Sequence, residues 1–170
     1  MSRIHIMDVD TTYSTSNVAV GGSGGYEIFL GAARKGSKPT LGRTVYLLKF
    51  FYGNANAISG IEIRLTDGIK CIVGRVSSAG NCSEIIFADG EKITSLKVWS
   101  FNRGGDGRLG RIELTTDRNG QLHVDAPREG EPHEYDVGSG TLIGIFGKGA
   151  GDIHCLGFSL LRPKVLQDYK

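Results

Sequence analysis

A repeat of 48 residues constrains the fold of this chain more than any other feature. Three segments of similar pattern begin at Gly42, Gly90 and Gly138, so they follow one another at equal steps. Each segment contains an apolar strand pattern, a polar or glycine-rich loop and a second strand pattern. The loops are expected at 53–57, 102–108 and 147–152. A period of this length is typical of repeat architectures, in which the units bury their apolar faces in one shared core.

The segments themselves have the pattern of β-strands. Apolar and polar residues alternate in Ile61–Leu65 and in Ile112–Thr115, and a turn signal follows each stretch. The chain has 26 glycines but only 4 prolines, which favours many short strands joined by tight turns. We therefore predict an all-β fold with three units around one axis. The alternative is a generic β-sandwich in which the glycine spacing is coincidental.

Composition excludes several classes of function. A length of 170 residues indicates one domain, and a net charge of +2 gives no electrostatic reason to expect nucleic acid or an anionic membrane as partner. No apolar run approaches the roughly 18 residues that a membrane-spanning helix needs, so we expect no membrane insertion by this chain. The N-terminus lacks the apolar stretch of a signal peptide. This predicts a cytoplasmic protein, export without a leader, or a chain that has already been processed.

No set of side chains suggests catalysis, a metal or another cofactor. Cys71, Cys82 and Cys155 do not have zinc-site spacing. Buried thiols are favoured over a Cys71–Cys82 disulfide. His154 precedes Cys155, but neighbours on a strand point to opposite faces and cannot act as a nucleophile and its base. An enzyme is therefore not expected.

Several motifs, in their order and spacing, resemble jacalin-related lectins. They are Val20–Gly25, Ile58–Gly68, Leu109–Thr116 and Leu142–Phe158. The resemblance spans roughly 18–162, with an extension at 1–17 and a tail at 163–170. Within the family, the sequence is most similar to the lectin module of natterin-like, aerolysin-type pore-forming proteins. It implies a β-prism I fold of three antiparallel sheets of about four strands with pseudo-threefold symmetry. It also implies metal-free binding of glycans, including mannose-type glycans.

The resemblance also indicates where a sugar would bind. It implies a pocket made by Gly25 and by the backbone N–H groups of Gly151 and Asp152, brought together because the first strand lies beside the last. The family's Gly-x-x-x-Asp pattern falls here on Ala150 and His154, so an imidazole replaces the expected carboxylate. If 152–154 is extended, Asp152 lies on the same face as His154 and supplies a carboxylate instead. The alternative is a turn without a ligand.

Two other segments bear on this site. In a threefold prism the loop at 101–108 lies at the same end, where Asn102, Arg103 and Asp106 would extend the site toward longer or acidic glycans. A solvated polar loop is the alternative. The extension at 1–17 contains a short strand pattern around Ile4 and Ile6. It would either pair with an exposed sheet edge, in this chain or in a neighbouring one, or form a disordered arm.

Three functions therefore compete. The first is a lectin whose partners are glycans or glycoproteins and whose shallow site would gain avidity from a homo-oligomer. The second is a protein-interaction module that has kept the prism and lost the sugar site. The third is the targeting half of a pore-forming toxin or immune effector. Against the third, we expect no pore-forming domain here, because the sequence ends at Lys170.

Overall fold

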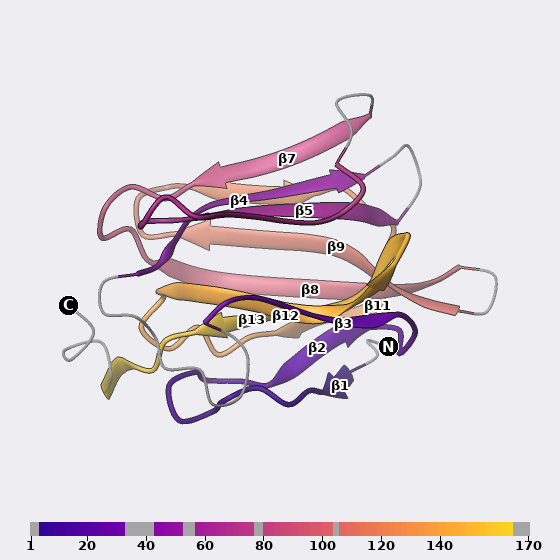
Figure 1. The fold of residues 1–170 in the computed structure, drawn as a ribbon, viewed down its shortest axis with the longest axis horizontal. Helices are drawn as coiled ribbons and strands as arrows, with labels where there is room; N and C mark the ends of the chain where they lie inside the picture. Colours follow the sequence, from indigo (N-terminus) through magenta and orange to yellow (C-terminus); the bar gives the residue numbers. More distant parts are fainter. Residues whose placement is uncertain (1–3, 33–42, 53–56, 77–79, 104–105, 165–170) are drawn as a thin grey trace.

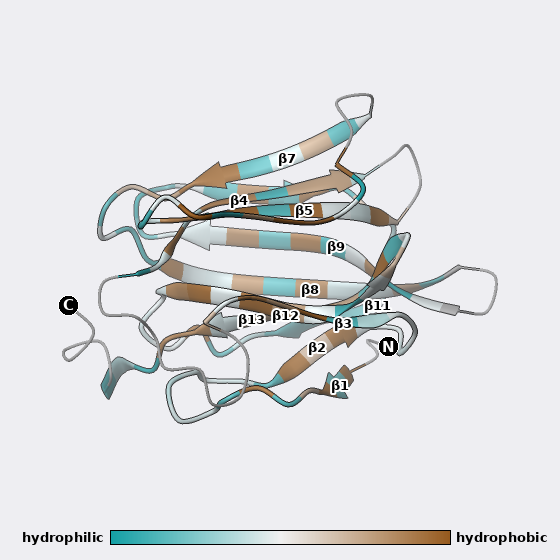
Figure 2. Ribbon diagram, in the orientation of Figure 1, coloured by the Kyte–Doolittle hydropathy of each residue, from teal (hydrophilic) through white to brown (hydrophobic). Residues whose placement is uncertain are grey.

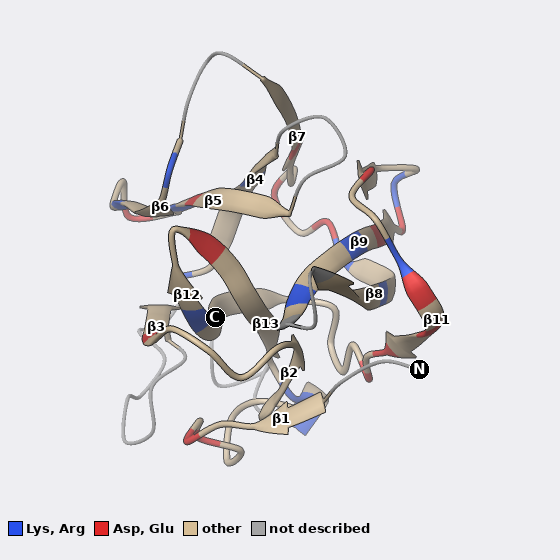
Figure 3. Ribbon diagram, turned by 90° about the vertical axis from the view of Figure 1, so that its right-hand side faces the viewer, with Lys and Arg blue, Asp and Glu red and all other residues tan. Residues whose placement is uncertain are grey.

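The computed structural model consists of three antiparallel β-sheets arranged around a common core (Figures 1 and 3). It describes residues 4–32, 43–52, 57–76, 80–103 and 106–164. The all-β prediction and the three-sheet prism are confirmed, and the β-sandwich alternative is wrong. None of the described segments is a helix that could cross a membrane.

Each sheet is built on one long hairpin flanked by outer strands. The first sheet has the order β1-β2-β13-β12-β3, the second β6-β5-β4-β7 and the third β10-β9-β8-β11. The bounds in the first sheet are β1 Ile4–Ile6, β2 Val18–Gly21, β3 Tyr26–Gly31, β12 Leu142–Ala150 and β13 Asp152–Leu160. Those in the second are β4 Val45–Tyr52, β5 Ile58–Leu65, β6 Lys70–Gly74 and β7 Asn81–Ile86. Those in the third are β8 Ile93–Arg103, β9 Asp106–Thr116, β10 Gln121–Val124 and β11 Glu129–Glu134.

The sequence repeat corresponds to the three central hairpins. Their first strands begin at Val45, Ile93 and Leu142, close to the expected period. In every sheet one connection also joins the two strands that flank the hairpin, before the hairpin in the first sheet and after it in the other two. These crossing connections join β2 to β3, β6 to β7 and β10 to β11. The described strand ends on either side of the three hairpin tips and the three crossing connections therefore lie at the same end of the prism.

The core lies where the apolar faces of the three sheets meet. Phe50, Leu114 and Phe158, one from each sheet, are fully buried in a single cluster. Hydrophobic and hydrophilic residues alternate along β8 and β9 (Figure 2), because one face of the sheet meets the core and the other meets solvent. Burial of this apolar surface is the main force that holds the sheets together.

The N-terminal extension adds a fifth strand to the first sheet. β1 pairs with β2, so four of the five strands correspond to the expected sheet and the extension belongs to its edge. In the segment that follows β1, Met7 and Val9 pack with Ala19, Phe146 and Cys155 in a second small hydrophobic cluster. The prediction that the extension pairs with a sheet edge of this chain is confirmed for Ile4–Ile6, and the disordered-arm alternative is wrong there.

The three cysteines are free thiols, so the Cys71–Cys82 disulfide does not form in this structure. The expectation of burial holds fully only for Cys155, whose pKa is raised by burial. Cys71 is half-buried and Cys82 is exposed. Cys82 differs from the expectation because it lies on β7, the edge strand of the second sheet.

Candidate functional site

The tip of the β12–β13 hairpin is the centre of the candidate site. The loop expected at 147–152 is mostly strand, because β12 continues to Ala150 and β13 begins at Asp152. Only Gly151 lies between them, with a φ of 80°, in the left-handed region that glycine tolerates and other residues resist. A Cβ on Gly151 would meet open space, so its backbone is accessible from outside.

The glycine-rich turn at 21–25 lies against this tip, as expected from the sequence. Pairing of β2 with β13 and of β3 with β12 brings the two segments together. Gly25 has a φ of 90°, and a Cβ there would lie 2.6–2.8 Å from backbone atoms of Gly149. Gly25 therefore allows an approach of two backbones that any larger residue would prevent.

His154 lies beside the same turn. Its backbone carbonyl accepts a hydrogen bond of 2.7 Å from the N–H of Gly22. Its imidazole lies over Gly24, where an added Cβ would be 2.7 Å from Nδ1. The imidazole therefore covers part of the turn. On the other side, the His5 ring nitrogen Nε2 lies 2.8 Å from the Gly21 carbonyl oxygen, so the N-terminal strand supports the turn as well.

Asp152 has a different environment from the open carboxylate that the sequence suggested. Its Oδ1 accepts a hydrogen bond of 3.0 Å from Nη2 of Arg75, and its Oδ2 lies 3.8 Å from Nε of Arg108. Only 13% of the Asp152 side chain is exposed. Arg75 follows β6 and Arg108 lies on β9, so this carboxylate joins the first sheet to both others. Figure 3 looks onto this end of the prism.

Two residues at this end were missed by the sequence analysis. Tyr26, directly after the glycine turn, is 82% exposed. Arg75 is 70% exposed and also donates a hydrogen bond of 3.3 Å from Nε to the Gly151 carbonyl. An aromatic residue that follows a glycine turn at a strand start was a signal available for Tyr26. Arg75 gave no such signal, because it lies 77 positions from Asp152 in the chain.

The structure describes only part of the loop at 101–108, which was expected to extend the site. The β8–β9 hairpin does lie at this end, since a Cβ on Gly22 would be 2.1 Å from the Gly107 carbonyl oxygen. Asn102 donates hydrogen bonds from its backbone N–H and its side-chain amide to Glu129. Arg103 and Asp106 pair at the ends of their strands, but their side chains lie outside the described residues. Among the described side chains no group of three or more could hold a metal ion.

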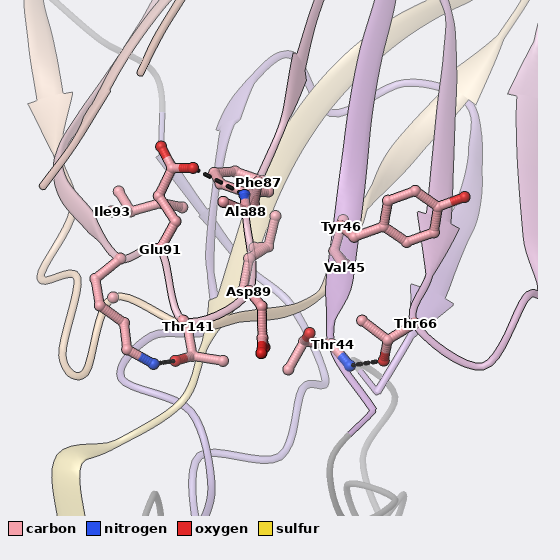
Figure 4. A pocket seen from close by; sticks show the side chains of 14 residues that line it. Thr44, Val45, Tyr46, Thr66, Phe87, Ala88, Asp89, Glu91, Ile93 and Thr141 are labelled. Atoms are coloured by element: carbon pink, nitrogen blue, oxygen red, sulfur yellow. Dashed lines mark hydrogen bonds between the residues drawn. The ribbon is translucent and has the colours of Figure 1, made fainter. Parts of the chain in front are cut away.

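A cavity of about 530 Å³ lies at the opposite end of the prism (Figure 4). Val45, Ile93 and Leu142, the first residues of the three central hairpins, contribute to its lining. Lys92 and Thr141 also line the cavity, and Lys92 donates a hydrogen bond of 2.8 Å to the Thr141 hydroxyl. None of the site residues expected from the sequence lines this cavity.

Comparison with known proteins agrees with the fold. Residues 18–159 match the family model described as the jacalin-like lectin domain. The comparison with curated protein sequences gave no match. Among solved structures, the lamprey immune protein superposes with a TM-score of 0.70 and 27% identity over 95% of this chain. This chain spans only 44% of the length of that protein.

Plant lectins are similar too. The Malaysian banana lectin superposes with a TM-score of 0.64 and 26% identity, over 85% of this chain and 95% of the lectin. The mannose-specific jacalin-related lectin from Morus nigra, solved with mannose, gives a TM-score of 0.65 at 14% identity, over 84% of this chain and 91% of the lectin, and so supports the fold alone. The family match covers most of the chain, and the three-sheet prism agrees with it. The chain therefore belongs to the jacalin-like lectin domain family.

Proposed function

We propose that this protein binds carbohydrate at the tip of the β12–β13 hairpin, without a metal ion. The observation that carries the proposal is the contact of the glycine turn at Gly24–Gly25 with the hairpin tip at Gly149–His154. Two segments distant in the sequence meet there, and open space lies beside the Cα of Gly151, while the imidazole of His154 covers part of the turn at Gly24. Jacalin-like lectins bind glycans, and the family membership supports the same function for this chain.

The chemistry of the site suits a sugar. Hydroxyl groups need donors and acceptors at close range, and backbone next to glycine can be approached closely. The N–H groups of Gly25 and Gly151 would donate to sugar oxygens, and the imidazole of His154 would offer a further polar contact. The exposed ring of Tyr26 is placed to contact the apolar face of a pyranose. The carbonyl groups of the two glycine segments would accept from hydroxyls.

A mannose-type ligand is the finer part of the proposal. One similar structure is described as mannose-specific and contains mannose, and another is a banana lectin. His154 stands where the family pattern has a carboxylate, and a neutral imidazole offers one acceptor in place of two oxygens. We therefore expect weaker binding of mannose than an aspartate at this position would give.

A glycan array tests the proposal. Wild type is compared with His154→Asp, which restores the family pattern, and with Tyr26→Ala, which removes the exposed ring. Tyr46→Ala is the matched control, because Tyr46 lines the cavity at the other end. We expect wild type to bind a defined set of glycans, His154→Asp to shift that set toward mannose, and Tyr26→Ala to lose about tenfold in affinity. Tyr46→Ala should leave binding unchanged.

A protein-interaction module is the second candidate function. The ion-paired carboxylate of Asp152 and the imidazole of His154 favour it, because both reduce the acceptors available to a sugar. If wild type binds no glycan but His154→Asp does, the sugar site has been lost at that one position and this candidate leads. If Tyr46→Ala abolishes glycan binding while Tyr26→Ala does not, the cavity at the other end is the site and our proposal is wrong.

A further inference from the structure

We infer that the hairpin-tip site selects saccharides that carry an anionic group, a carboxylate or a sulfate ester, and that Arg75 contacts that group. The inference rests on the proposed function, because it names the class of sugar bound at the same site. It follows from the kinds of hydrogen-bonding group that this end of the prism leaves exposed.

The carboxylate of the site is mostly covered. Asp152, whose carboxylate belongs to the hairpin tip, is 13% exposed, and its two oxygens face the guanidinium groups of Arg75 and Arg108. A neutral sugar hydroxyl would have to compete with these cations for the carboxylate. Charge-assisted pairs between guanidinium and carboxylate are stronger than neutral hydrogen bonds, so the competition disfavours the hydroxyl.

The donor side is exposed. The Arg75 side chain is 70% exposed although Nη2 and Nε already bond to Asp152 and to the Gly151 carbonyl. A guanidinium has five N–H donors, so those on the solvent side remain for a ligand. Because two bonds hold the guanidinium in place, a ligand would not have to order it first.

The local charge also favours an anion. Among the side chains that the structure describes, Arg75 and Arg108 place two positive charges beside the carboxylate of Asp152. Arg108 is only 14% exposed, and its Nε makes no hydrogen bond within the described part of the chain. A planar carboxylate or a sulfate can accept two parallel N–H bonds from a guanidinium. Gly151, with open space beside its Cα, gives such a group access to Arg75.

The test compares sugars that differ only in their anionic group. Polymers carrying mannose, mannuronic acid or mannose 6-sulfate, and the same three forms of galactose, are immobilised so that weak sites gain avidity. The proteins are wild type, Arg75→Gln and Arg75→Lys. Arg118→Gln is the matched control, because Arg118 is exposed in the turn between β9 and β10 at the other end of the prism.

We expect wild type to bind an anionic polymer at least about tenfold more tightly than its neutral counterpart, and less tightly as salt rises. Arg75→Gln should lose this preference, Arg75→Lys should keep part of it, and Arg118→Gln should stay within about twofold of wild type. The carboxylate and sulfate polymers show which anion is preferred.

Three results would overturn the inference. Binding of neutral polymers alone would refute it while leaving the proposed function intact. Anionic binding that Arg118→Gln weakens as much as Arg75→Gln does would reflect general electrostatic attraction and no particular site. If wild type binds neither these polymers nor any glycan of the array, the proposed function itself fails. Thermal unfolding of each variant confirms that a loss of binding is not a loss of fold.

Discussion

At one end of the prism, ion pairs of Asp152 join the three sheets, whereas at the other end Lys92 joins the third sheet to the first by a hydrogen bond to a hydroxyl, and the ion pair of Arg43 with Asp67 stays within the second sheet. Asp152 contacts Arg75 and Arg108 at the first end. At the second, Lys92 donates to Thr141, and Glu91 accepts from Thr116 and from the N–H of Ala88. At the first end, the guanidinium of Arg75 and the backbone of Gly151 are exposed. At the second end, the residues surround the cavity shown in Figure 4. Closing a threefold prism thus requires contacts between sheets, but not contacts of one kind.

The largest expected difference between the ends concerns two glycines. Gly25 and Gly68 have nearly the same φ, 90° and 92°, but a Cβ at Gly25 meets Gly149 whereas one at Gly68 meets nothing within 4 Å. Gly68→Ala should cost about 1–2 kcal/mol of unfolding free energy from backbone strain alone. Gly25→Ala should cost clearly more and abolish glycan binding. Urea denaturation measures both, and equal costs would show that the close contact at Gly25 can relax.

The next prediction compares two contacts between sheets, the ion pairs of Asp152 and the hydrogen bond from Lys92 to Thr141. Asp152→Asn should lower the unfolding free energy by about 1–3 kcal/mol, because it leaves the half-buried Arg108 without its counter-charge. Lys92→Met removes one hydrogen bond to a hydroxyl and should cost about 1 kcal/mol.

Salt distinguishes these two variants. High ionic strength weakens the ion pairs of the wild type, so the cost of Asp152→Asn should fall with salt while that of Lys92→Met changes little. The same salt response in both would mean that charge plays no special part in closing the site end.

The smallest effect is expected from Glu91. The hydrogen bond from the Thr116 hydroxyl, and then that from the Ala88 N–H, lower the pKa of this carboxylate from its ordinary value of 4.5. A depressed pKa adds stability above the ordinary pKa, and this stability is lost as pH falls through the lower, folded value. Glu91→Gln should therefore lose less stability than wild type on acidification below about pH 4.5, by under about 1 kcal/mol since the group is partly exposed.

Thermal midpoints between pH 7 and pH 3 measure this effect. Glu134→Gln, on the exposed outer face of β11, makes the same change of charge and serves as the control. A parallel loss of stability in wild type and Glu91→Gln would contradict the prediction.

The sequence was sufficient to predict most of the fold, because strand alternation and a repeat period are local properties. Ile61–Leu65 and Ile112–Thr115 lie in β5 and β9, and the period matches the three central hairpins. Strand ends were less predictable. Lys148, Gly149 and Ala150 have no alternating pattern, yet β12 continues through them because β13 pairs with Lys148, Gly149 and Ala150, and β3 also pairs with the first two. Pairing with neighbours thus determined structure where propensity did not.

The site was predictable in its position but not in its charges. The meeting of Gly25 with the hairpin tip follows from a strand order that the resemblance implied. The partners of Asp152 do not, because Arg75 and Arg108 come from the other two sheets and no spacing in the sequence relates them to the tip. Contacts between sheets depend on how side chains meet across the end of the prism.

The crossing connections have a consequence for redesign. The same path over a hairpin tip occurs three times, from β2 to β3, from β6 to β7 and from β10 to β11. The first is formed by Gly22–Gly25, the second begins with Arg75, and the third contains Asp125 and Arg128. One architectural element thus carries three different chemistries. Replacing 125–128 with a glycine-rich turn would be the direct way to build a second, chemically distinct recognition surface on the same scaffold.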